Sequence, residues 1–147
     1  MRSFVNGVFD ILHVGHLRLL QYASLYGELT VAINSDNYTV KSTATQKRPI
    51  NADKHRAELL SGLSCVNRVL IFIEDNPVAL LNHLYRIGKG PHVAVKGIEY
   101  KHKDFPEREI IQDNGTQLFF YDSTIQVSST ELLTAQNERD PGDTGRW

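Results

Sequence analysis

Apolar residues along the chain recur in five short runs, and polar stretches separate them. The runs cover residues 4–9, 29–34, 68–73, 92–96 and 117–121. Short, largely apolar runs bounded by turn residues are typical of strands buried in a parallel sheet. The pattern therefore predicts five strands.

Between these runs the apolar residues take helical spacing. In the first helix they are Leu19, Tyr22, Ala23 and Tyr26, at i, i+3, i+4 and i+7, and Gly27 ends it. Further helices are predicted over 52–63, 76–88 and 106–112. Strands that alternate with helices form right-handed βαβ units.

We expect an α/β fold, a single Rossmann-like domain over residues 1–136. Its five-stranded, mostly parallel sheet would carry helices on both faces, and a flexible C-terminal tail would span 137–147.

Composition narrows the classes of function. The chain has 147 residues and a net charge of −1, which argues against nucleic acid or a membrane surface as a partner. No run is long enough to span a membrane and the first residues do not resemble a signal peptide. Cys65 is the only cysteine, so no disulfide framework is needed and a cytoplasmic location is expected.

The junction between the first strand and the first helix carries the most distinctive chemistry. It reads Gly7-Val8-Phe9-Asp10-Ile11-Leu12-His13-Val14-Gly15-His16. His13 and His16 stand at the predicted helix start, where free N–H groups and the helix dipole favour an anion. Gly15 lacks a Cβ and lets a ligand approach the backbone closely. One histidine there would be an ordinary cap, but two around a glycine favour a phosphate site.

This junction resembles the G-x-F-D-x-x-H-x-G-H signature of the cytidylyltransferase-type nucleotidyltransferases. The matching residues are Gly7, Phe9, Asp10, His13, Gly15 and His16. Other stretches recur in the same order in that family: Asn34-Ser35-Asp36, Arg48-Pro49-Ile50-Asn51, Val95-Lys96-Gly97 and Val127-Ser128-Ser129-Thr130. The chain is most similar to the adenylyltransferase domain that activates heptose 1-phosphate, and next to glycerol-3-phosphate cytidylyltransferase.

The resemblance implies an enzyme that couples a sugar phosphate to ATP, forming an NDP-sugar and pyrophosphate. His13 and His16 would be catalytic, with Gly7, Phe9, Asp10 and Gly15 around the nucleotide. Mg²⁺ would be held mainly by the nucleotide phosphates, without a protein-built metal site. An attacking phosphate monoester is already anionic near neutral pH, so catalysis would rest on positioning and charge stabilisation. A homodimer is also implied.

Two further cations are predicted to be catalytic. The polar stretch 38–47 resembles a loop that brings a lysine to the triphosphate in related enzymes; Lys41 is the predicted residue and Lys47 the alternative. Arg56 lies on the inward side of its helix, where a cation needs a partner. A carboxylate and the nucleotide phosphates are both candidates for that partner, and the resemblance favours the phosphates.

The ends of the last two strands complete the predicted nucleotide site. Lys96 could face the phosphates or pair with Glu99, and Gly97 could permit close approach of the nucleotide. Ser128, Ser129 and Thr130 begin a capping box, which is often purely structural but whose free N–H groups can also bind an anion. The resemblance places the β- and γ-phosphates there.

One departure bears on the substrate. Cytidylyltransferases of the glycerol-phosphate type carry Arg-Thr-Glu-Gly-Ile-Ser-Thr-Thr where this chain has residues 123–130, and the arginine and glycine are absent here. Loss of that arginine favours ATP over CTP. A CTP-dependent enzyme acting on glycerol 3-phosphate or a similar polyol phosphate remains the alternative. A non-catalytic nucleotide-binding module is the alternative of another class.

Overall fold

The sheet has five parallel strands in the order β3-β2-β1-β4-β5. The computed structural model describes residues 1–38 and 49–122. The strands are β1 (Arg2–Gly7), β2 (Glu28–Asn34), β3 (Arg68–Phe72), β4 (Val93–Gly97) and β5 (Gln117–Tyr121). All four pairings are parallel, which sharpens the predicted mostly parallel sheet and confirms the Rossmann-like α/β fold. The predicted boundary at 136 and the tail 137–147 lie outside the described residues.

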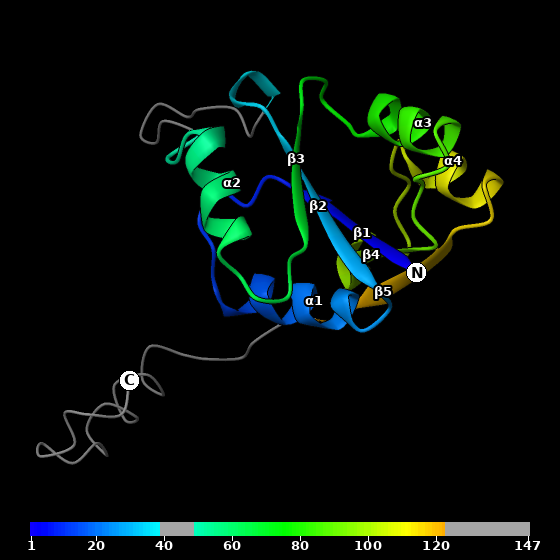
Figure 1. The fold of residues 1–147 in the computed structure, drawn as a ribbon, viewed down its shortest axis with the longest axis horizontal. Helices are drawn as coiled ribbons and strands as arrows, with labels where there is room; N and C mark the ends of the chain where they lie inside the picture. The colour runs from blue at the N-terminus through cyan, green and yellow to red at the C-terminus, as the bar shows by residue number, and fades with distance from the viewer. Residues whose placement is uncertain (39–48, 123–147) are drawn as a thin grey trace, which may run out of the picture.

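Helices cover both faces of this sheet (Figure 1). They are α1 (Val14–Ser24), α2 (Asp53–Ser61), α3 (Val78–Arg86) and α4 (Arg108–Asp113), and η1 (Asp36–Tyr38) and η2 (Ile98–Tyr100) are short 3₁₀ turns. In Figure 1 α1 and α2 lie on one side of the strands, and α3 and α4 lie on the other. None of the helices in residues 1–38 and 49–122 is long and apolar enough to cross a membrane.

Alternation along the central strands divides the core into two layers. Phe4 packs with the α3 and α4 layer, whereas its neighbour Val5 packs with the α1 and α2 layer. On β4 the same alternation sends Val93 and Val95 to one layer and Ala94 to the other. Successive side chains of a strand point to opposite faces, so a strand buried on both sides is apolar throughout. This is why the strand runs were visible in the sequence.

The strand order fixes where a ligand can bind. β1 pairs with β2 on one side, starting at Arg2 opposite Glu28, and with β4 on the other, with Ser3 opposite Val93. The order therefore reverses between β1 and β4. In open α/β sheets, ligands bind at such a switch point, at the carboxyl ends of the strands. The turn after β1 and the turn after β4 flank this crevice.

Candidate functional site

A cavity of about 430 Å³ lies at the switch point between β1 and β4. Its walls come from the end of β1 and the turn after it, the first turn of α1, and the end of β4 with the turn after it. The lining residues include Gly7, Phe9, Asp10, His13, His16, Lys96, Gly97, Glu99 and Tyr100. Its volume lies within the range of small-ligand sites. Seven of the predicted site residues are thus brought together from segments ninety residues apart. Gly15 is buried in the first turn of α1, beside these residues.

The two histidines are held by each other and by the backbone. The His13 Nδ1 caps α1 by accepting from the Gly15 N–H at 3.1 Å, and the His16 Nδ1 accepts from the His13 N–H at 3.3 Å. The imidazoles stack, with ring centroids 3.7 Å apart. Because each Nδ1 is an acceptor, the proton of each ring is assigned to Nε2. Both rings therefore keep one N–H donor for a ligand.

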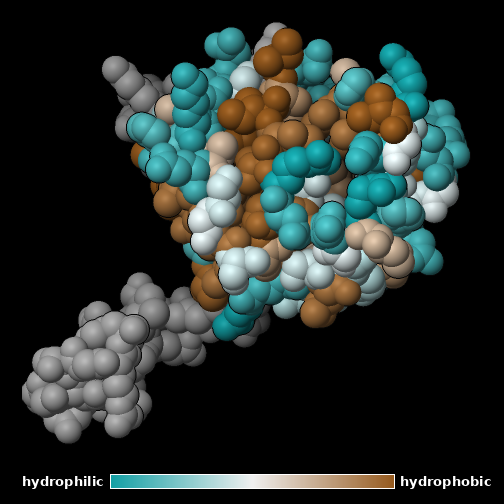
Figure 2. All heavy atoms as spheres, viewed as in Figure 1, coloured by the Kyte–Doolittle hydropathy of each residue, from teal (hydrophilic) through white to brown (hydrophobic). Residues whose placement is uncertain are grey.

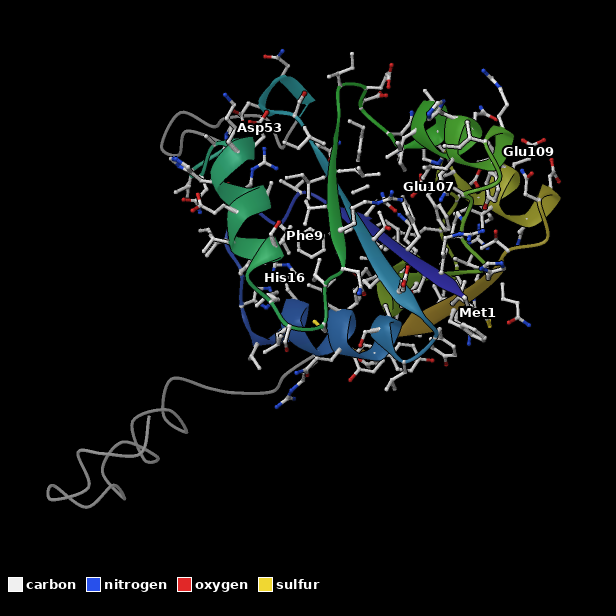
Figure 3. The ribbon with its side chains drawn as sticks, in the orientation of Figure 1. Met1, Phe9, His16, Asp53, Glu107 and Glu109 are labelled. Carbon is white, nitrogen blue, oxygen red and sulfur yellow. The ribbon has the colours of Figure 1, made fainter. Side chains whose placement is uncertain are left out.

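His16 is also kept uncharged. Burial, and secondarily the neighbouring His13, lower the pKa of His16 from 6.5 to about 4. The ring is thus a neutral hydrogen-bond donor at physiological pH, as suits a group that stabilises charge on a phosphate without transferring a proton. The Phe9 ring packs against it in an edge-type contact, with centroids 5.0 Å apart (Figure 3).

Asp10 fastens the turn after β1 to the segment that enters α2. Its carboxylate accepts from the Ile50 and Asn51 N–H groups, both at 2.9 Å, and its carbonyl accepts from the Asn51 side chain at 2.6 Å. Two carboxylate oxygens bonded to backbone N–H groups form a rigid clamp. Asp10 therefore lines the cavity and also fixes the backbone of Ile50 and Asn51 beside it.

Arg56 is completely buried and fully engaged within the protein. Its guanidinium donates to the Asn51 carbonyl, the Val8 carbonyl and the Asp36 carboxylate, each at 2.9 Å. The sequence left a carboxylate and the phosphates open as its partner, and the structure contains the carboxylate. Asp36 in turn accepts from the Asp53 N–H at 2.8 Å at the start of α2. Arg56 therefore ties α2 to the turn that carries the histidines, and it is absent from the cavity wall.

Lys96 has a partner that the sequence did not predict. Its ammonium pairs with Glu107, which directly precedes α4. The predicted carboxylate partner was Glu99, which is closer in the sequence. It also lies 4.6 Å from the ring centroids of both Tyr100 and Phe105. Lys96 and Glu107 are both buried. The cost of removing two charges from water is offset only when the charges are in close contact with each other. In the sequence, Glu107 was only an acidic residue near the start of a predicted helix, and nothing indicated that it would pair with Lys96.

The turn after β4 is held by Arg108, another residue whose role was not predicted. Its guanidinium donates to the carbonyls of Tyr100, Lys101 and Lys103. The carboxylate of Glu99 lies over Gly97, where a Cβ would come within 2.4 Å of a carboxylate oxygen. Glu99 thus occupies the space that Gly97 leaves open at the cavity wall.

Several predicted residues lie outside the described part of the chain. They are Lys41, its alternative Lys47, and Ser128, Ser129 and Thr130. Within residues 1–38 and 49–122, no three His, Cys, Asp or Glu side chains gather in a way that could hold a metal ion.

Comparison with known proteins bears on the whole domain. The model of the cytidylyltransferase-like family matches residues 4–134. The chain is 40% identical over 127 residues to the bifunctional protein HldE of Helicobacter pylori J99, covering 86% of this chain and 26% of that protein. HldE of Geotalea uraniireducens is 39% identical over 131 residues, covering 88% of this chain and 26% of that protein. The chain thus spans about a quarter of the length of these relatives.

A solved structure supports the fold alone. It is the lipopolysaccharide core biosynthesis protein from Thermoplasma volcanium GSS1, with a TM-score of 0.63 and 24% sequence identity, and the match covers 85% of this chain and 98% of that one.

Proposed function

Because the chain belongs to the cytidylyltransferase-like family, we propose that it is a nucleotidyltransferase that joins a sugar phosphate, of the heptose 1-phosphate kind, to ATP. The phosphate oxygen of the acceptor attacks the α-phosphorus of ATP in line. The bond from the α-phosphorus to the bridging oxygen breaks, and pyrophosphate leaves with that oxygen. The products are an NDP-sugar and pyrophosphate.

The stacked histidine pair is the observation that carries this proposal. With each Nδ1 occupied by a backbone N–H, His13 and His16 offer two Nε2–H donors from rings that line one cavity at a helix start. Preorganised donors stabilise the charge that develops as a phosphorus–oxygen bond breaks, and losing one typically costs about 10²–10³ in rate. No proton must be removed from the acceptor phosphate, so a neutral His16 suits this step.

Two further features fit the same reaction. Arg56 holds Asp36, and Asp10 holds the backbone of Ile50 and Asn51. These residues lie on either side of the segment 39–48 in the sequence, and we propose that Lys41 of that segment reaches the triphosphate. We also propose that Ser128, Ser129 and Thr130 bind the β- and γ-phosphates. Both Asp10 carboxylate oxygens already accept backbone N–H groups, so Mg²⁺, which would neutralise charge on the triphosphate, would be held mainly by the phosphates themselves.

A pyrophosphate-release assay tests the function. The protein would be incubated with Mg²⁺ and ATP or CTP, each with a sugar 1-phosphate or with glycerol 3-phosphate, and with pyrophosphatase to report release. We expect release with ATP and the sugar 1-phosphate. Release only with CTP and glycerol 3-phosphate would overturn the substrate assignment. Nucleotide binding without release from any pair would favour a non-catalytic binding module.

We also propose that the protein acts as a homodimer. Apolar side chains reach the surface along the β3 edge of the sheet, where Ile71 and Ile73 are exposed, and Figure 2 shows apolar side chains gathered on the face where β3 lies in front. A sedimentation mass of one chain at micromolar concentration would contradict this proposal.

A further inference from the structure

Phe9 has an unusual backbone conformation in the turn between β1 and α1. Its φ is +51°, and among the described residues it is the only one other than glycine with positive φ. Side chains disfavour this left-handed region, and a non-glycine residue is held there only when its surroundings fix it. Such strain gathers at sites where a side chain must be placed in one position.

The surroundings of Phe9 do fix it. The carbonyl of Val8 accepts from Arg56, and the carboxylate of Asp10 is bonded to the backbone of the 50–51 segment. The residues on either side of Phe9 are therefore both anchored to the start of α2. The strained conformation is imposed from outside and is not a property of a free turn.

The consequence of this conformation is the place of the ring. It folds back over Gly7, where a Cβ would meet the Phe9 Cε2 at 2.9 Å. Phe9 is 7% exposed and packs in the core layer under α1. From there it packs against His16 in an edge-type arrangement, with centroids 5.0 Å apart and an interplanar angle of 67° (Figure 3). His13 stacks on the same imidazole, with ring centroids 3.7 Å apart.

We propose that Phe9 is a positioning residue for His16, placing the imidazole for phosphate contact and shielding one side of it from water. Gly7 is required because only a residue without a side chain leaves room for the ring. This inference rests on the proposed function insofar as His16 contacts the phosphates. It departs from the predicted role of Phe9, which was contact with the nucleotide.

The environment of His16 makes this inference testable by titration. Burial is the larger cause of the lowered pKa of His16, and proximity to His13 is the smaller. The other titratable side chains that line the cavity are Asp10 from the same turn, and Lys96, Glu99 and Tyr100 from the far wall. Substitutions at Phe9 and Gly7 replace none of these groups, so a shift in the titration of His16 would report the change in the ring packed against it.

The experiment compares Phe9→Leu and Gly7→Ala with a control, Leu20→Ala, in the full chain. Phe9→Leu keeps an apolar side chain and removes the aromatic ring, whereas Gly7→Ala keeps the ring and displaces it. Leu20 is fully buried on α1 but does not line the cavity, so its truncation reproduces general destabilisation. The His16 imidazole resonance would be assigned by its absence from the spectrum of His16→Gln and followed by NMR between about pH 3.5 and 8.

We expect the His16 midpoint to rise into the range between 5 and 6.5 in Phe9→Leu, to rise less in Gly7→Ala, and to stay below 5 in Leu20→Ala. Turnover of Phe9→Leu should fall about tenfold with the KM for ATP nearly unchanged, because a displaced donor affects the transition state most. A wild-type midpoint in both Phe9→Leu and Gly7→Ala would overturn the proposal. A shifted midpoint in a protein that transfers nothing to any acceptor would instead refute the proposed function and leave the positioning role standing.

Discussion

Replacing Arg56 with methionine tests whether this arginine holds the histidine turn or contacts a phosphate. Methionine keeps much of the apolar stem and removes the guanidinium. The groups that lose their donor are the carbonyls of Val8 and Asn51 and the carboxylate of Asp36. The structure therefore predicts a loss of stability first and a loss of activity as its consequence.

The magnitude follows from how exposed those acceptors are. Each part-buried carbonyl left without a donor costs about 1–3 kcal/mol. The Asp36 side chain is 41% exposed and can be solvated, so the ion pair itself adds about 0–1 kcal/mol. With two such carbonyls, we expect the free energy of unfolding to fall by about 2–7 kcal/mol. For a domain of this size, this corresponds to a decrease in Tm of about 5–25 °C.

Urea denaturation and ATP binding would be measured side by side. Arg68→Met is the matched control, because Arg68 is exposed on the edge strand β3. At a temperature where both variants are folded, Arg56→Met should bind ATP within about tenfold of wild type. The contrary result would be a stability equal to that of Arg68→Met with an ATP affinity about a hundredfold lower than that of wild type. Arg56 would then be a direct phosphate ligand, and its role in holding the histidine turn would be refuted.

Two other predictions follow from buried titratable groups. The imidazole of His16 titrates near 6.5 in the unfolded chain and near 4 when folded, so the unfolded chain takes up a proton first and stability falls as the pH drops from 6.5 to 4. After allowance for the partial exposure of His16, the loss of unfolding free energy is about 1–2 kcal/mol. Urea denaturation at pH 7 and 4.5 should therefore show a pH dependence of stability that is smaller in His16→Gln than in wild type by about 1–2 kcal/mol. An equal pH dependence in the two proteins would contradict this prediction. Glu107→Gln should destabilise the protein by about 3–5 kcal/mol because it leaves the Lys96 ammonium buried without a carboxylate. The exposed Glu109→Gln is its control, and equal Tm values would show that the pair does not contribute.

Much of the fold could be predicted because burial on both faces makes a strand apolar throughout. The strand from Gln117 to Tyr121 matched its prediction, and the second strand began one residue earlier than expected, at Glu28. The first strand was predicted two residues too late, because Val8 and Phe9 are apolar yet belong to the turn. Apolar character reports burial, and only hydrogen bonding to a neighbouring strand decides where a strand ends.

The sequence predicts residues whose type itself suggests the chemistry, such as the histidines. It does not predict a role that depends on which residue the fold brings into contact. His13 and His16 follow from their spacing around Gly15. The partners of Arg56 include two carbonyls, which no residue type encodes, and an aspartate twenty positions away. Lys96 had a nearer carboxylate in sequence at Glu99, yet the packing of α4 brings Glu107 to it. Nothing in the sequence indicated the positive φ that the structure has at Phe9.

Turnover of His16→Ala tests the central claim most directly. His55→Ala is its control, since His55 is exposed on α2 and lies outside the cavity wall. With Mg²⁺, ATP and a sugar 1-phosphate, we expect His16→Ala to release pyrophosphate about 10²–10³ times more slowly than wild type, with its fold intact by circular dichroism. His55→Ala should match wild type. Release by His16→Ala at the wild-type rate would contradict the assignment of this cavity as the site of nucleotidyl transfer.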